Sequence, residues 1–186
     1  YWGDDDVWAR RSDPRSVAMD GDGRVWLTGR VRGVDAQPDF CTDVANAFAD
    51  FYPLARGTRQ VFMYDPVTEA FSEIDTCFSA DHNQISEDDD IYYGFTGGLG
   101  WIDIDIWDET QDAEAAQGWC PGVVDTNGDG VITRGWTEPT DAIDPIRDHR
   151  IRVSCYSPAV NPADGSVWCS GNGQRDNKLV RIDLGE

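Results

Sequence analysis

Short apolar runs separated by Asp, Gly and Pro make up most of the chain, and helical periodicity is nearly absent. Three stretches repeat one pattern, in which an apolar strand leads through an Asp, Gly or Asn turn to a second strand with aromatic residues. They span residues 16–29, 83–94 and 157–171. Since the turn residues tolerate positive φ and the flanking Val, Ile, Trp and Tyr favour strands, each stretch predicts a β-hairpin.

Further strands accompany these hairpins and indicate a repeated unit. Residues 60–64 and 70–74 predict two strands across a turn at 65–68, and residues 178–183 predict another strand. Such loosely periodic units are typical of β-propeller blades, each of about 40–45 residues. The sequence therefore predicts an all-β fold: a β-propeller of about four blades, or part of a larger ring.

Two longer segments interrupt the expected blades, at about 33–57 and 103–150. Each contains a candidate helix, since residues 109–118 have the best helical pattern and residues 43–51 a weaker one. The chain has 186 residues with 40% hydrophobic content, enough for a single domain with its own core. We therefore expect one propeller domain or propeller segment over residues 1–186.

The charge balance excludes several classes of partner. Asp and Glu number 35 against 15 Lys and Arg, which gives a formal charge of −20. Nucleic-acid phosphates and anionic membrane surfaces require a basic face, so neither is expected as a partner. No apolar run approaches the roughly 18 residues of a membrane span. The Asp excess fits turn chemistry, and it also fits calcium binding or a salt-adapted surface.

The strongest chemical motif is D-T-N-G-D-G-V-I-T at residues 125–133, which follows the front of an EF-hand-type calcium loop. Asp125, Asn127 and Asp129 hold positions one, three and five, where side-chain oxygens bind the ion. Val131 would offer its carbonyl at position seven, and Thr133 would act at position nine directly or through water.

Position twelve, where such loops carry a bidentate Glu, holds Trp136 in this chain. Glu138 lies two residues later and would substitute if the chain loops back, with Asp141 and Asp144 as further options. The alternative is an Asn-Gly/Asp-Gly turn that binds no metal. We expect calcium, as a structural ion that pins the long insertion.

His82 is the one candidate for catalysis. It would face the central channel of a propeller and act as a general base or metal ligand. The alternative is a histidine held by hydrogen bonds at the start of a strand. The acidic run at 88–90 is expected to face water.

The tryptophans allow two roles. Trp26 and Trp168 occupy equivalent positions in two hairpins and are expected to pack between blades. A carbohydrate-stacking platform is the alternative for Trp residues that reach the surface, and the candidates are Trp101, Trp107, Trp119 and Trp136.

The hairpin D-G-x-V-W and the strand pair Y-D-P-x-T-x-x-F resemble the streptogramin lyase-like (virginiamycin B lyase-like) seven-bladed β-propellers. The similarity is closer to large, uncharacterised secreted bacterial propeller proteins of that superfamily. Matching segments keep the same order over most of the chain, among them MDGDGRVWLTGRVR, RQVFMYDPVTEAFSEIDTCFSADHNQ, VVDTNGDGVIT and NPADGSVWCSG. The resemblance implies a propeller fold and export, but no known reaction. The lyase uses histidines and an acid around a metal, and neither histidine of this chain aligns with that set.

The five cysteines are dispersed and form no C-x-x-C pair, which indicates disulfides and a secreted or periplasmic location. Cys41 and Cys77 lie in segments that match the resembled family beside one blade, so they are the first expected pair. Cys155–Cys169 would staple the last hairpin and leave Cys120 unpaired, while Cys120–Cys155 is the competing pair.

These observations favour a non-catalytic exported β-propeller module, stabilised by calcium and disulfides, that serves binding or assembly with a protein partner in a larger complex. One alternative is a metal-dependent lyase-like enzyme acting at the central channel, which requires His82 beside a carboxylate. A further alternative is a carbohydrate-binding propeller, which requires exposed Trp side chains and a glycan or small-molecule ligand.

Overall fold

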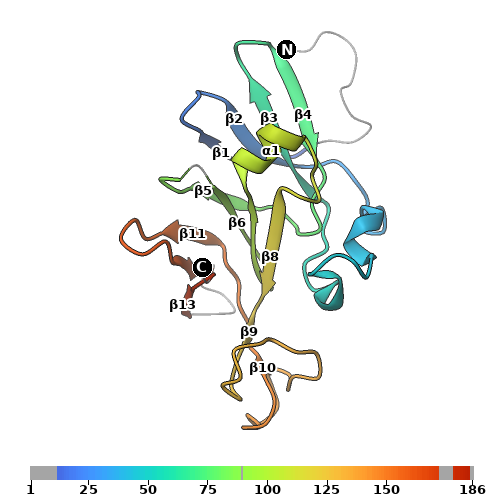
Figure 1. Cartoon of the computed structure of the whole chain (residues 1–186), viewed down its shortest axis with the longest axis vertical. Helices are drawn as coiled ribbons and strands as arrows, with labels where there is room; N and C mark the ends of the chain where they lie inside the picture. Colours follow the sequence, from blue (N-terminus) through green and yellow to red (C-terminus); the bar gives the residue numbers. More distant parts are fainter. Residues whose placement is uncertain (1–11, 89, 172–177, 185–186) are drawn as a thin grey trace.

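The computed structural model describes residues 12–88, 90–171 and 178–184. The described residues form three larger antiparallel sheets and a short two-stranded ribbon (Figure 1). Each larger sheet is a meander, in which every strand pairs with the next one in the sequence. This mostly β architecture confirms the all-β part of the expectation.

The first sheet contains β1 (Arg15–Met19), β2 (Val25–Arg30), β3 (Arg59–Asp65) and β4 (Ala70–Ile74). The second contains β5 (His82–Ile85), β6 (Ile91–Phe95), β7 (Gly98–Ile102) and β8 (Gln117–Pro121). The third contains β11 (Ser157–Val160), β12 (Val167–Ser170) and β13 (Leu179–Ile182). The ribbon consists of β9 (Val123–Val124) and β10 (His149–Arg150). The helical elements are α1 (Ile104–Thr110) and the 3-10 turns η1 (Asp39–Thr42) and η2 (Ala49–Phe51).

The predicted hairpins are present as β1–β2, β5–β6 and β11–β12. The predicted strand pair is present as β3–β4, and its turn is held by Asp65, whose carboxylate accepts from the Val67 amide at 2.8 Å. The last predicted strand contains β13. Local turn chemistry and alternating apolar residues were therefore sufficient to predict these strands.

The helix begins earlier than the sequence pattern predicts. Asp103 caps α1 by accepting from the Ile106 amide at 2.8 Å, and Gln111 ends it with a left-handed φ of 54°. The expectation of a helix over 109–118 was wrong, because residues from Gln117 onward pair with β7 as strand β8. Strand β8 thereby divides the expected insertion at 103–150 into a connection over 103–116, which contains α1, and an excursion over 122–150. In the weaker candidate, residues 43–51, only η2 forms.

The three sheets stack in chain order, with the second between the other two. Trp26 and Tyr93 are fully buried in the cluster that joins the first and second sheets. Leu99 and Val167 are fully buried in the cluster that joins the second and third. The second sheet is therefore apolar and covered on both faces.

The first strands of the three sheets, β1, β5 and β11, lie next to one another. Ser16 Oγ of β1 lies 3.2 Å from His82 Nδ1 of β5. The His82 ring lies 4.3 Å, centroid to centroid, from the ring of Tyr156, which directly precedes β11. Because each sheet continues outward by sequential pairing, the last strands lie farthest from this line of first strands.

Both expected disulfides are present, Cys41–Cys77 and Cys155–Cys169, and Cys120 is free. The first ties η1 to the segment after β4, and the second links β12 to the residue two positions before β11. Two disulfides indicate an oxidising compartment outside the cytoplasm. Within the part of the chain that is described, no helix is long and apolar enough to cross a membrane.

Gly94 of β6 allows the third sheet to approach the second closely. A Cβ at this position would lie 1.9 Å from the carbonyl oxygen of Cys155. Backbone hydrogen bonds join the two sheets at this point, since the Cys155 amide donates to the Phe95 carbonyl at 3.2 Å and the Gly97 amide to the Val153 carbonyl at 2.9 Å. The absent side chain therefore permits a backbone contact that fixes the spacing of the sheets.

We expect Gly94→Ala to lower the free energy of unfolding by about 1–3 kcal/mol, because the added methyl group must push backbone atoms apart. Urea denaturation followed by tryptophan fluorescence measures the change. Ser157→Ala, at an exposed position of β11, is the control and should change stability by less than about 0.5 kcal/mol. Equal effects of the two substitutions would contradict the role of Gly94.

Candidate functional site

The candidate metal loop belongs to an excursion that projects from the stacked sheets below β8 (Figure 1). Its base is the β9–β10 ribbon, in which Val124 pairs with His149. The two limbs stay together beyond the ribbon, because the Thr126 hydroxyl donates to the Arg147 carbonyl at 2.6 Å. The ribbon therefore brings residues 125–133 and the segment before β10 into contact.

Asp125 organises the loop by accepting two backbone hydrogen bonds. Its Oδ1 accepts from the Gly128 amide at 2.6 Å and its Oδ2 from the Gly130 amide at 2.8 Å. Both glycines have a positive φ, of 77° and 80°, which favours glycine and produces the sharp turn. The motif therefore folds as a compact loop around the first of the predicted ligands.

Asn127 and Asp129 continue the same pattern. Asn127 Oδ1 accepts from the Asp129 amide at 3.0 Å, and Asp129 Oδ1 accepts from the Val131 amide at 2.9 Å. The Asn127 amide group also donates to Asp129 Oδ2 at 3.1 Å. The predicted ligands at positions one, three and five are thus neighbours, with their oxygens engaged by backbone amides of the loop.

The loop offers oxygen donors, which are the ligands that calcium prefers. In the described part of the chain, however, no group of three or more His, Cys, Asp and Glu side chains converges closely enough to hold a metal ion. Ion binding at this loop would therefore require its carboxylates to turn from the backbone amides towards a common centre.

Glu138, the predicted substitute at the end of the loop, is engaged elsewhere. Its carboxylate forms an ion pair with Arg150 of β10 at 3.1 Å and accepts from the Trp136 indole at 3.3 Å. Thr133, in contrast, directs both its amide and its hydroxyl to Asp148, at 2.7 and 3.2 Å. Asp148 was not among the predicted site residues, because nothing in the spacing of the sequence relates it to the loop.

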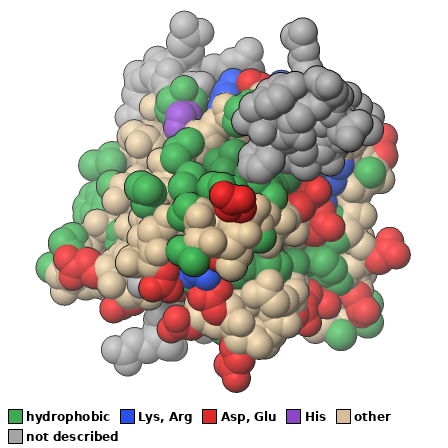
Figure 2. All heavy atoms as spheres, turned by 90° about the horizontal axis from the view of Figure 1, so that it is seen from above, with side chains coloured by type: hydrophobic (Ala, Val, Ile, Leu, Met, Phe, Trp, Pro, Cys, Tyr) green, Lys and Arg blue, Asp and Glu red, His purple; other side chains and the backbone are tan. Residues whose placement is uncertain are grey.

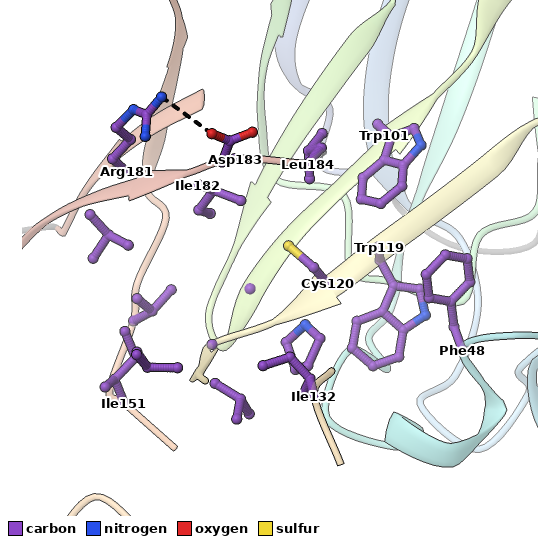
Figure 3. Close-up of a pocket in the computed structure, with 17 residues that line it drawn as sticks. Phe48, Trp101, Trp119, Cys120, Ile132, Ile151, Arg181, Ile182, Asp183 and Leu184 are labelled. Carbon is purple, nitrogen blue, oxygen red and sulfur yellow. Dashed lines mark ion pairs between the residues drawn. The ribbon is translucent and has the colours of Figure 1, made fainter. Parts of the chain in front are cut away.

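A cavity of about 400 Å³ lies between the second and third sheets, beside the excursion (Figure 3). Trp101, Trp119 and Cys120 line it from the second sheet, and Ile151 lines it from the segment after β10. Ile132, from the candidate metal loop itself, also projects into it. The loop is therefore anchored to the apolar contact between two sheets.

Cys120 is the free thiol of this cavity. Burial raises the pKa of Cys120 to about 11, so the thiol is protonated at neutral pH. A protonated thiol is a poor nucleophile and a poor metal ligand. Cys120 therefore acts here as a small apolar side chain of the cavity wall.

His82 lies where the first strands of the sheets meet. Its Nδ1 faces Ser16 Oγ and its ring packs on Tyr156. The neighbouring carboxylate, Asp81, forms its closest ion pair with Arg15 at 3.3 Å. His82 thus makes one side-chain hydrogen-bond contact, through Nδ1, and its Nε2 is buried without a partner among the described residues.

The tryptophans considered for a carbohydrate platform are not all accessible. Trp107 and Trp119 are only 5% and 1% exposed, so these two rings do not offer a stacking surface. Trp136 stacks on Phe51 with a centroid distance of 6.2 Å, and Trp101 lines the cavity. Trp136 of the excursion thus packs against η2, and Trp101 of β7 packs at the wall of the cavity.

Asp90 is an acidic residue with an unusual environment. Burial, followed by the nearby Asp103 carboxylate, raises the pKa of Asp90 to about 6. Its Oδ2 also accepts from the Tyr92 hydroxyl at 3.4 Å. The folded state therefore disfavours the negative charge of Asp90 at neutral pH.

No protein-family model and no curated protein matches this chain.

The environment of Asp90 predicts a pH-dependent stability. A carboxyl group whose pKa is raised on folding contributes stability that is fully present below its unfolded pKa and is lost as the pH rises through its folded pKa. The protein should therefore lose stability between about pH 4, the ordinary Asp value, and about pH 6. Asp90→Asn should lose less over this interval, as thermal melts in steps of pH will measure. Glu109→Gln, at an exposed position, is the control, and parallel curves for wild type and Asp90→Asn would contradict the prediction.

Proposed function

We propose that this chain is an exported, non-catalytic β-propeller module, stabilised by calcium and disulfides, that serves assembly through the two end faces of its stack of sheets. The observation that carries the proposal is an internal comparison: equivalent positions of the first and third sheets are covered in one sheet and open in the other. The radial order of the sheets, first strands together and last strands outward, supports the propeller arrangement.

The first and third sheets are built alike. Ala18 pairs with Trp26 in the first sheet as Ala159 pairs with Trp168 in the third. In both sheets a turn that contains an Asp-Gly sequence precedes the strand with the tryptophan. Positions can therefore be compared one by one between the two sheets.

The first hairpins of these two sheets differ in which side chains they leave exposed. Trp26 faces the second sheet and is fully buried, whereas Trp168, on the far face of the third sheet, is only partly buried. Conversely, Val160 packs in the cluster between the second and third sheets, while Met19 at the equivalent position of β1 is 65% exposed. Val17, on the same face as Met19, is 69% exposed, whereas Phe62 of β3, in the same cross-strand row, is only 1% exposed, so this face is open along β1.

The proposed occupant of each end face is a further antiparallel sheet of the same construction. The second sheet covers both its neighbours in this way, and propeller rings repeat the contact around an axis. The proposed partner is a second copy of the chain, which carries such a sheet. The third sheet of one copy would contact the first sheet of another, which is a head-to-tail arrangement.

The surface charge is compatible with this assembly. Seen from the upper end of the molecule, hydrophobic side chains occupy much of the middle, and acidic side chains are scattered around them without forming one patch (Figure 2). Scattered charge of one sign keeps the surface soluble while leaving apolar areas available for contact.

The calcium part of the proposal predicts a chelator-sensitive stability. An ion that binds only the folded state contributes about 2.7 kcal/mol at a free concentration one hundred times its Kd, which corresponds to roughly 5–10 °C in the unfolding midpoint of a chain of this size. Scanning calorimetry with excess calcium and with EGTA measures this shift. Asp125→Ala should remove it, and an unchanged midpoint in the wild-type protein would refute a stabilising calcium.

The assembly part predicts different consequences for two equivalent substitutions. Val160→Asp should lower the unfolding midpoint of the chain, because its side chain packs in an apolar cluster. Met19→Asp should leave the midpoint nearly unchanged, since the residue is exposed. Sedimentation equilibrium at increasing concentration should show self-association of the wild type that Met19→Asp abolishes. A wild-type chain that stays monomeric at every concentration, or a variant that still associates, would overturn the proposed contact.

A further inference from the structure

Asp148 places a carboxylate deep against the candidate metal loop. The residue is only 1% exposed. Its Oδ2 accepts from the amide and the hydroxyl of Thr133, at 2.7 and 3.2 Å, so the carboxylate is aimed at position nine of the loop. Its Oδ1 is buried and has no hydrogen-bond partner among the described residues.

The basic side chains next to Asp148 in the sequence do not neutralise it. Arg147 donates to the carbonyl oxygens of Gly135 and Trp136, and Arg150 forms its ion pair with Glu138. A buried carboxylate without a cation and with one oxygen unpaired is costly, and a bound ion is one of its regular explanations. A bound cation would therefore offset the cost of burying the Asp148 carboxylate.

The ribbon register places this carboxylate beside the first predicted ligand. Val124 of β9 pairs with His149 of β10, and one further step in this register would set Asp125 opposite Asp148. The hydrogen bond from Thr126 to the Arg147 carbonyl shows that the limbs remain adjacent at the next step. Residues opposite each other in an antiparallel pair project to the same side, with Cβ atoms about 5 Å apart.

The loop also lacks one acidic ligand of its own. Position twelve holds Trp136, and Glu138 is engaged by Arg150. Asp148 lies fifteen residues beyond Thr133 in sequence, and it reaches the loop from the opposite limb. It therefore supplies the charge that the loop lacks, from a place that the linear motif does not include.

We propose that Asp148 is the acidic ligand that completes the calcium site of residues 125–133, in place of a residue at the end of the loop. This inference rests on the proposed calcium binding. On binding, the carboxylates of Asp125 and Asp129 turn from the loop amides towards the ion that Asp148 shares. Calcium then links the two limbs of the excursion, and it fixes Ile132 in the cavity between the second and third sheets.

The test is calcium titration by isothermal calorimetry of the full chain, with two isosteric variants that each remove one negative charge. Asp148→Asn should weaken calcium binding by about tenfold to a hundredfold, the range typical for lost carboxylate support at metal sites. Glu138→Gln is the matched control and should bind as the wild type does. Near-UV circular dichroism in EGTA checks that both variants are folded.

A second measurement needs no variant. In wild-type protein with labelled Asp and Glu carboxyl carbons, the Asp148 signal should shift on calcium saturation and the Glu138 signal should not. If the wild type binds no calcium, the proposed calcium site itself is wrong. If it binds calcium but Glu138→Gln loses affinity, or only the Glu138 signal shifts, Asp148 is not the ligand and the inference is overturned.

Discussion

Each of the three larger sheets has apolar side chains on both faces, so both faces of each sheet need to be covered by other parts of a protein. Strand geometry imposes this requirement, because successive side chains point to opposite faces. In β6, Tyr93 packs towards the first sheet and Tyr92 towards the third, and both are buried. Stacking in chain order satisfies the requirement completely for the second sheet alone. The partly uncovered faces of the first and third sheets follow from the same rule, and they define where a neighbouring sheet would fit.

The large negative charge has a local explanation in this architecture. Asp20 accepts from the Trp26 indole at 2.8 Å, and hydrogen bonds from Trp26 and Arg24 lower the pKa of Asp20 although its burial alone would raise it. Asp65 and Asp164 accept from amides of their own turns. Many of the acidic residues therefore stabilise the turns between strands. The net charge of −20 is in part a consequence of having many tight turns.

Sequence reasoning succeeded where the determinants are local. The hairpins and the β3–β4 pair depend on turn residues and on alternating side chains within a few positions, and all of them are present. It failed over 109–118, where α1 ends at Thr110, Gln111 has a left-handed φ, and only Gln117 and Gly118 pair with β7 as part of β8. Asp148 could not be predicted because β9 and β10 have only two residues each, too few for any periodicity to show.

The position of Ile132 connects the candidate metal loop to the contact between the second and third sheets. In Figure 3 this side chain points into the same cavity as Cys120 and Trp119 of β8, while the predicted ligand residues lie on either side of it in sequence. The turn of the loop is held by hydrogen bonds from its backbone amides to its own side chains, and two contacts tie it to the other limb. An ion bound to residues of both limbs would fix the loop further relative to the ribbon. Because Ile132 is part of that loop, fixing the loop also fixes one wall of the cavity. Ion binding on the excursion would thus strengthen the contact between the second and third sheets, which otherwise depends on apolar packing and on the close backbone approach at Gly94.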